Sequence, residues 1–165
     1  MHFTFCPDCG TRCSLRQMGD DGAVPFCEQC QKPLFDMFST CVLSVVTNPA
    51  GEIALIRQSY GDTARYVGVA GYMKPGETAE EAAAREISEE IGIPPDSVEF
   101  VFSKWHAPRG QLMLCFHART AETAFRCSGE VREAKWFAPD AAEQAVRPGS
   151  IIAALTHAVC GIIKN

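Results

Sequence analysis

The sequence lacks an apolar run long enough to cross a bilayer, and it lacks an excess of positive charge. A transmembrane helix needs about 20 consecutive apolar residues, whereas the longest candidate, residues 151–163, is interrupted by polar side chains and a glycine. The formal net charge of the 165 residues is −5, which disfavours broad electrostatic binding to nucleic acids or anionic lipids. We therefore expect no membrane partner and no broad binding to nucleic acids.

Signals for secretion and for disulfide bonding are also missing. The first residues show no charged segment followed by an apolar stretch, which is the pattern that directs secretion. The nine cysteines are an odd number, and a full disulfide framework needs paired cysteines in an oxidising compartment. We therefore expect metal-bound or reduced thiols and a cytoplasmic location.

Four cysteines near the start of the chain have the spacing of a zinc site. They form two Cys-x2-Cys pairs separated by 17 residues, which is typical of tetrathiolate zinc. The four are Cys6, Cys9, Cys27 and Cys30. Pro7 and Gly10 favour a tight turn around the first pair, and this stretch resembles a zinc-ribbon knuckle. Because about 30 residues bury too little core to fold alone, we predict a structural Zn²⁺ and a zinc ribbon over residues 1–34, with unligated thiols as the alternative.

The remainder of the chain, residues 35–165, alternates predicted strands with predicted helices. Apolar and β-branched runs bounded by turns predict strands at 38–46, 52–58, 66–72, 98–103, 112–118 and 134–137. Capping residues predict three helices. The first spans residues 78–91, a second short helix begins at a capping box of Asp140 with Glu143, and the third spans residues 150–159. Residues 59–65 are expected to be a polar loop, and Cys41 and Cys115 to be core residues. This mixture predicts the α+β class or an α/β/α domain.

The predicted helix 78–91 is unusually acidic. At about 100° per residue, its carboxylates Glu86, Glu89 and Glu90 share one face. Like charges at this spacing repel unless something positive covers them, and hard divalent cations take oxygen ligands of this kind. The alternative is a solvated acidic surface.

The surrounding residues extend this pattern into a motif. A glycine at position 71 is followed by Glu77 and then by Arg-Glu-Ile-Ser-Glu-Glu-Ile-Gly-Ile from Arg85. The segment 71–93 resembles the Nudix box at every fixed position. The resemblance implies an α/β/α sandwich with a mixed sheet and hydrolysis of diphosphate-linked nucleotides with Mg²⁺ or Mn²⁺. It also implies a catalytic element whose residues are Arg85, Glu86, Glu89 and Glu90, in which Arg85 and Glu77 hold the helix face in place.

The same resemblance implies the metal ligands. These are the Gly71 carbonyl, Glu86, Glu89, Glu90 and, further along the chain, Glu130. For Glu130 the alternative is a solvated loop carboxylate.

A zinc ribbon directly before a Nudix domain resembles the NADH pyrophosphatases, and the similarity covers residues 6–159. It implies a nucleotide substrate such as NADH, NAD or ADP-ribose, a homodimer, and substrate-binding residues. These are Tyr72, Phe35 (from the other subunit), Trp105 and Met113. Aromatic faces stack on bases, although Tyr72 and Phe35 could instead fill a core or a hinge.

The segment 103–111 departs from that family. The NADH pyrophosphatases carry Ser-Gln-Pro-Trp-Pro-Phe-Pro-x-Ser here, and of this array only Ser103 matches in register. The departure leaves the nicotinamide substrate open. Lys104 and Arg109 could contact phosphates and Trp105 could stack on a different base, or all three could be ordinary loop residues.

Two functions therefore compete. The first is a divalent-metal-dependent Nudix pyrophosphatase. The second is a nucleotide-sensing or RNA-binding Nudix protein that recognises its ligand without hydrolysing it. The complete box favours catalysis, and the acidic net charge disfavours a polymer ligand.

Overall fold

The computed structural model describes residues 3–61 and 64–163 of the chain, so part of the predicted loop 59–65 lies outside the described residues. The chain divides into two compact units, residues 1–39 and 40–165. No described helix has both the length and the apolar character needed to span a membrane. Each unit is described by itself below.

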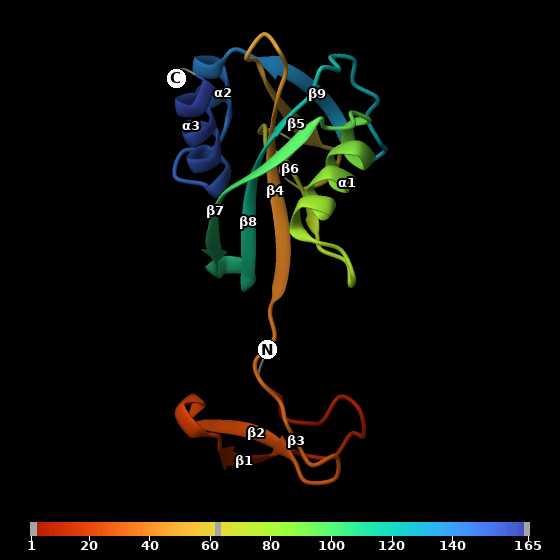
Figure 1. Cartoon of the computed structure of the whole chain (residues 1–165), viewed down its shortest axis with the longest axis vertical. Coiled ribbons are helices and arrows are strands. Elements are labelled where there is room, and N and C mark those ends of the chain that lie inside the picture. The colour runs from red at the N-terminus through yellow and green to blue at the C-terminus, as the bar shows by residue number, and fades with distance from the viewer. Residues whose placement is uncertain (1–2, 62–63, 164–165) are drawn as a thin grey trace. The chain divides into compact units, whose positions relative to one another are not determined.

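The first unit is a small antiparallel sheet in the order β1-β2-β3 (Figure 1). Its strands are β1 (Ser14–Gln17), β2 (Ala23–Cys27) and β3 (Lys32–Pro33). Strands β1 and β2 form an antiparallel hairpin, and the residues of β3 pair with the end of β2. The hydrophobic cluster of this unit has only three buried members, namely Cys6, Cys27 and Leu34.

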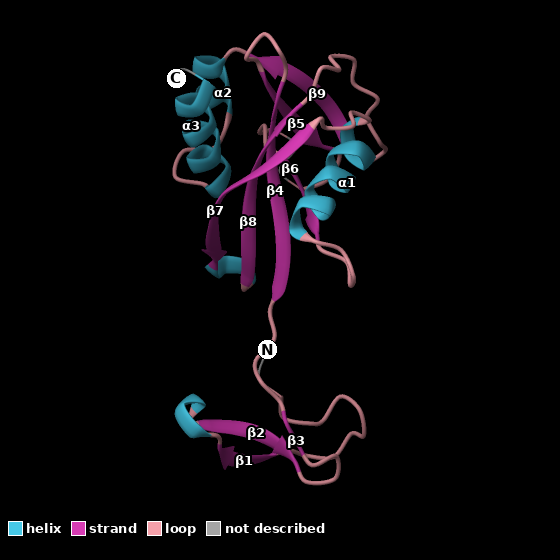
Figure 2. Cartoon of the chain, in the orientation of Figure 1, coloured by secondary structure: helices cyan, strands magenta, loops and turns pink. Residues whose placement is uncertain are grey.

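The second unit is built on a six-stranded sheet in the order β7-β8-β4-β5-β9, with β6 paired to β4 (Figure 2). The strands are β4 (Ser39–Thr47), β5 (Ile53–Gln58), β6 (Val69–Tyr72), β7 (Ser97–His106), β8 (Gln111–Arg119) and β9 (Val131–Phe137). Strand β4 is apolar along most of its length, as expected of a strand with both faces covered.

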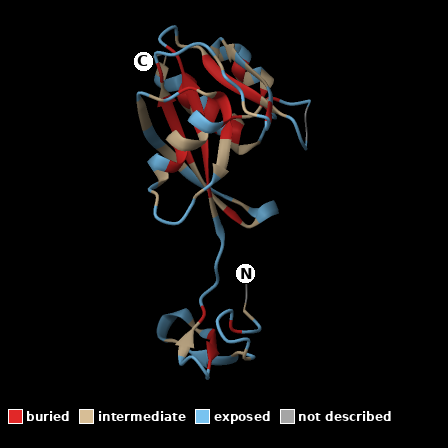
Figure 3. Ribbon diagram, turned by 90° about the vertical axis from the view of Figure 1, so that its right-hand side faces the viewer, coloured by how far each residue is buried: buried red, intermediate tan, exposed pale blue. Residues whose placement is uncertain are grey.

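Helices cover both faces of this sheet. They are α1 (Ala79–Ile91), α2 (Pro139–Ala145) and α3 (Ile151–Ile163). Successive side chains of β4 point to opposite faces, so Leu43 and Val45 pack with residues of α2 and α3, while Val46 packs with residues of α1. The buried residues gather between these layers (Figure 3). The predicted α+β class and the α/β/α sandwich with a mixed sheet are confirmed.

Three local predictions need correction or extension. The capping box of Asp140 and Glu143 is wrong: α2 begins at Pro139 without a side-chain cap, because proline at the first helical position already has a helical φ. Strand β7 continues to His106, so Trp105 and His106 belong to a strand and not to a loop. The Ser150 cap of α3 is confirmed, since its Oγ accepts from the Ala153 N–H at 3.2 Å, but the helix continues to Ile163.

Candidate active site

The Nudix-like segment forms the end of β6, a tight loop and helix α1. The predicted capping box is confirmed: the Thr78 hydroxyl accepts from the Glu81 N–H at 3.2 Å, and the Glu81 carboxylate accepts from the Thr78 N–H at 2.8 Å. Gly92 ends the helix at a φ of +68° and donates its N–H to Ser88, as a left-handed cap should. Both ends of the acidic helix are therefore fixed by local chemistry.

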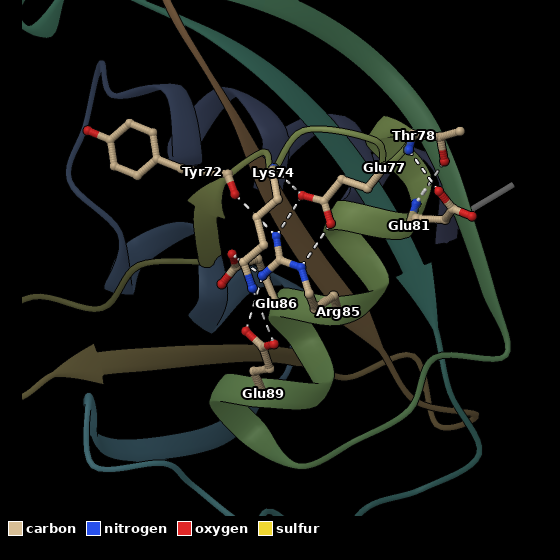
Figure 4. Close-up of polar contacts among 8 residues, drawn as sticks. All are labelled: Tyr72, Lys74, Glu77, Thr78, Glu81, Arg85, Glu86 and Glu89. Carbon is tan, nitrogen blue, oxygen red and sulfur yellow. Dashed lines mark hydrogen bonds and ion pairs between the residues drawn. The ribbon is translucent and has the colours of Figure 1, made fainter.

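Arg85 is the centre of a charged network beside β6 (Figure 4). Its guanidinium binds Glu77 through two hydrogen bonds of 2.9 and 2.8 Å, and it reaches Glu86 at 2.6 Å and Glu89 at 3.1 Å. It also donates to the Tyr72 carbonyl at 3.1 Å. The Arg85 hydrogen bonds, together with the Lys74 N–H, lower the pKa of Glu77 to about 2. The predicted structural pairing of Arg85 with glutamates is confirmed.

Gly71 is held against the carboxylate of Glu86. A Cβ at position 71 would lie 2.0 Å from the Glu86 Cδ, so a larger residue there would displace the Glu86 carboxylate. Glycine thus allows this carboxylate to lie against the backbone of β6. The Glu86 side chain is only 14% exposed.

Glu90 lies on the buried side of the same helix. It is 7% exposed, and its Oε2 has no hydrogen-bond partner. Burial, followed by the negative charges of Glu86 and Glu130, raises the pKa of Glu90 to about 8, and the Ala70 N–H offsets part of this effect. A carboxylate in such a place is stable in its charged form only when a cation compensates it.

The segment before β9 brings Glu130 to this site. The Arg126 N–H donates to the Ile91 carbonyl and the Ser128 N–H to the Glu90 carbonyl, both at 2.9 Å. These bonds satisfy the last carbonyls of α1 and tie the segment to the helix end. Glu130 follows directly, and its exposed carboxylate is close enough to affect the pKa of Glu90 and of Tyr60.

The acidic groups fit a hard divalent cation by their chemistry. The orphaned Glu90 oxygen is an oxygen donor without a partner, which is what Mg²⁺ or Mn²⁺ requires. Among the described residues, the glutamate oxygens are spread more widely than the cysteine sulfurs, which are the one set of ligand atoms all within 4.8 Å of one another.

The four predicted zinc ligands do come together. The sulfurs of Cys6 and Cys30 are 3.9 Å apart and those of Cys9 and Cys27 are 3.5 Å apart. Hydrogen bonds with Thr11 lower the pKa of Cys9 to about 6, whereas the hydrogen bond with Cys9 and burial raise that of Cys30 to about 12. The set therefore resists full ionisation unless a metal binds, since metal ligation requires and stabilises the thiolates. Cys13 lies beside the cluster but outside the set.

The predicted substrate-binding residues fall into two groups. The Tyr72 ring is 57% exposed, and its hydroxyl accepts from the Gln111 amide at 2.6 Å. Trp105 and Met113 both line a cavity of about 640 Å³ in the second unit. Phe35 is half exposed and belongs to the first unit, so its expected role in stacking stays a prediction.

Several residues of this site were missed by the sequence prediction. The backbone N–H of Ala70, the amide of Gln111 and the N–H of Ser128 each hold a group of the site in place. No sequence signal could have found them, because each acts through a contact between segments that are distant along the chain. Arg147 lines the cavity and could have been suspected from its place just before the predicted helix cap.

An acidic helix that follows a glycine-bearing strand, set on an α/β/α sandwich, defines a known class of proteins. The model of the NUDIX domain matches residues 37–155, and the chain belongs to this family.

Several individual proteins and solved structures are similar to this chain. The chain is 32% identical over 142 residues to the NAD-capped RNA hydrolase NudC of Pseudomonas aeruginosa, covering 85% of this chain and 49% of that protein. The chain thus spans about half the length of this curated relative.

Similar solved structures include a NUDIX hydrolase from Nitrosomonas europaea, with a TM-score of 0.72 and 19% identity. The match covers 98% of this chain and 91% of that chain. Another is the NUDIX domain of Shewanella oneidensis NrtR in complex with ADP ribose, with a TM-score of 0.67, 14% identity and coverage of 84% and 94%. These two structural similarities support the Nudix fold.

Proposed function

We propose that the protein is a divalent-metal-dependent pyrophosphatase that hydrolyses the diphosphate linkage of a nucleotide such as NADH, NAD or ADP-ribose. The observation that carries the proposal is the buried Glu90 carboxylate, which lies near Glu86 and Glu130 with one oxygen unpartnered. Such a group destabilises the fold unless it serves a cation. A merely solvated acidic surface would not bury it.

Four carboxylates and one carbonyl would hold the catalytic metal. They are Glu86, Glu89, Glu90 and Glu130, with the carbonyl of Gly71. When bound, Mg²⁺ or Mn²⁺ supplies positive charge that neutralises the diphosphate and activates water for attack. Arg85 keeps Glu86 and Glu89 oriented through its own hydrogen bonds. The unpartnered oxygen of Glu90 is able to accept a proton.

The substrate class is proposed from the relatives. The name of the Pseudomonas aeruginosa relative says that it acts on NAD-capped RNA, and the NrtR domain was solved with ADP ribose. Both ligands contain a diphosphate bonded to adenosine. We propose the same kind of substrate for this chain, with capped RNA included, and Tyr72 as the ring that stacks on a base.

The first unit would bind one structural Zn²⁺ through its four cysteines, since a closed tetrathiolate shell leaves no position for a substrate. We further propose a ribbon over residues 1–34, a Nudix domain over 35–165, a homodimer in which Phe35 reaches the partner, and a cytoplasmic location. The five cysteines outside this set form no disulfide, which fits a reducing compartment.

A substrate panel tests the proposal. Purified protein is incubated with NADH, NAD, ADP-ribose, diadenosine polyphosphates and deoxynucleoside triphosphates, with Mg²⁺, with Mn²⁺ and with a chelator. We expect metal-dependent release of mononucleotides from at least one diphosphate-linked compound. Tight binding of one compound without turnover of any would contradict the proposal and favour the sensor.

A further inference from the structure

The cavity of about 640 Å³ in the second unit has an unusual charge balance. Its cationic lining residues are Lys104, Arg109 and Arg147. Among the described residues that line it, none is an aspartate or a glutamate. This contrasts with Arg85, whose guanidinium is occupied by glutamates. A cavity with three cations and no acid attracts an anion.

The start of helix α3 adds to this positive character. Gly149, Ser150 and Ile151 line the same cavity, and the first backbone N–H groups of a helix have no partner within the helix. The helix has 13 residues, so its dipole places partial positive charge at this end. Gly68, just before β6, permits close packing here, because a Cβ at this position would lie 2.6 Å from the Ser44 carbonyl oxygen and 2.7 Å from a methyl carbon of Ile152.

The cavity adjoins the acidic site through strand β6. Ala70 lines the cavity, while its neighbour Gly71 lies against Glu86. The hairpin that carries Arg109 is tied to the same strand, because the Gln111 amide donates to the Tyr72 hydroxyl at 2.6 Å. The charges of Arg109 and of Glu86 both act on Cys41. The cavity and the acidic site are therefore neighbours at β6.

Apolar groups complete the lining. Trp105, Met113 and Ile152 offer surfaces for a base or a sugar beside the cations. A site that combines such surfaces with a few placed charges is typical of nucleotide binding. A neutral nicotinamide ring would not need three cations. The oxidised nicotinamide ring is positively charged, so these cations would repel it.

We propose that this cavity binds a phosphate group of the substrate other than the diphosphate that is cleaved, and that Lys104, Arg109 and Arg147 thereby select nucleotides that carry such a phosphate. The inference rests on the proposed pyrophosphatase function. The shared chemistry is a phosphate on a ribose of the substrate. Its source is either a 2′-phosphate, as in NADPH, or the 3′-phosphodiester of an NAD-capped RNA.

Matched substrate pairs test the inference. We expect kcat/KM to be about tenfold higher for NADPH than for NADH, or for an NAD-capped oligonucleotide than for NAD, since one charge-assisted hydrogen bond has roughly this effect. A preference in the first pair alone identifies the 2′-phosphate, and one in the second pair alone identifies the 3′-linked chain. Equal kcat/KM within both pairs would overturn the inference.

Three single variants test whether the cavity causes the preference for substrates with the extra phosphate. In Lys104→Gln, Arg109→Gln and Arg147→Gln we expect the preference for the substrate with the extra phosphate to fall several-fold, mainly through KM. Arg126→Gln, an exposed arginine outside the cavity, is the matched control. An unchanged preference in all three variants would overturn the assignment.

A binding experiment without Mg²⁺ separates this inference from the proposed function. We expect adenosine 2′,5′-bisphosphate or adenosine 3′,5′-bisphosphate to bind at least about tenfold more tightly than AMP in calorimetry, and Arg147→Gln to reduce that difference. Equal affinities would overturn the inference even if hydrolysis occurs. Conversely, a clear difference without any turnover would keep the inference and contradict the pyrophosphatase.

Discussion

The two units of the chain are stabilised in different ways. In the first unit, two of the three buried residues in the hydrophobic cluster are cysteines of the tetrathiolate set. In the second unit, three clusters of buried aliphatic and aromatic residues lie on the two faces of a six-stranded sheet. We therefore propose that metal binding replaces a core in the first unit, whereas the second unit has a core and would use its metal for chemistry.

The two sites nevertheless share one physical principle. In each, one acidic group has a raised pKa and resists ionisation without a cation: Cys30 through its hydrogen bond with Cys9 and burial, and Glu90 through burial and the charges of Glu86 and Glu130. The consequence of an unfilled site differs. An empty zinc site should unfold its unit, while an empty glutamate site should leave the fold intact and abolish turnover.

The largest expected effect comes from removing a zinc ligand. We expect Cys27→Ser to lose the single bound zinc and to unfold the first unit, because zinc binding contributes about 10–16 kcal/mol to folding in small metal-dependent domains. Metal analysis and hydrogen exchange of the β1 and β2 amides measure this. The matched control Cys13→Ser, beside the cluster but outside the set, should keep the zinc. Loss of turnover in parallel with the zinc would show that the units are not separable.

The next effect concerns the buried glutamate. We expect Glu90→Gln to lower kcat by on the order of a hundredfold or more at saturating Mg²⁺, as removal of a key electrostatic group does. Because glutamine needs no compensating cation, the variant should be at least as stable as the parent in the absence of metal. Glu80→Gln, on the exposed first turn of the same helix, is the control. Unchanged turnover in Glu90→Gln would refute its role.

A buried histidine gives the second unit its own pH dependence. His117 is 1% exposed, and burial, followed by the positive charge of Arg119, lowers its pKa to about 4. Below the ordinary value of about 6.5, the unfolded chain binds a proton that the native chain does not. The contribution of His117 to the free energy of unfolding should therefore fall by roughly 2 kcal/mol between pH 7 and pH 5, and the difference between the parent and a His117 variant separates it from the opposing contribution of Glu90.

Denaturant unfolding followed by tryptophan fluorescence measures this dependence, because both tryptophans, Trp105 and Trp136, lie in the second unit. A His117→Gln variant should lack this contribution over the same range. If the parent and the variant have the same slope, another group is responsible.

The smallest effect comes from glycine 71. We expect Gly71→Ala to displace the Glu86 carboxylate and to lower kcat by about tenfold. Gly161→Ala, in an open position of helix α3, should keep full activity and raise the free energy of unfolding by about 0.5–1 kcal/mol. Normal kinetics in Gly71→Ala would mean that the close approach of strand and helix does not position the glutamate.

Sequence reasoning predicted the parts of this molecule that are encoded locally. The cap of Thr78 and Glu81, the stop at Gly92 and the cysteine pairs depend on residues close together in the chain. It missed the α2 start, because the fixed φ of Pro139 competed with a possible side-chain cap. It also placed Glu86, Glu89 and Glu90 on one face without foreseeing that Glu90 alone is buried. That depends on how α1 packs against the sheet, which no local pattern specifies.

The basic cavity illustrates the same limit. Lys104 and Arg109 were considered phosphate contacts from the sequence, but Arg147 and the start of α3 join them only through the fold. Contacts between residues so far apart in the sequence form only when the helices pack against the two faces of the sheet.

The most direct test of the account is product formation from a single diphosphate-linked nucleotide as the concentration of Mg²⁺ is raised, with the zinc left in place. The account predicts that two mononucleotides appear only when Mg²⁺ or Mn²⁺ is present, and that Glu90→Gln forms them at a small fraction of the parent rate. Equal product formation with a chelator that leaves the zinc bound, or equal rates in the parent and Glu90→Gln, would contradict it.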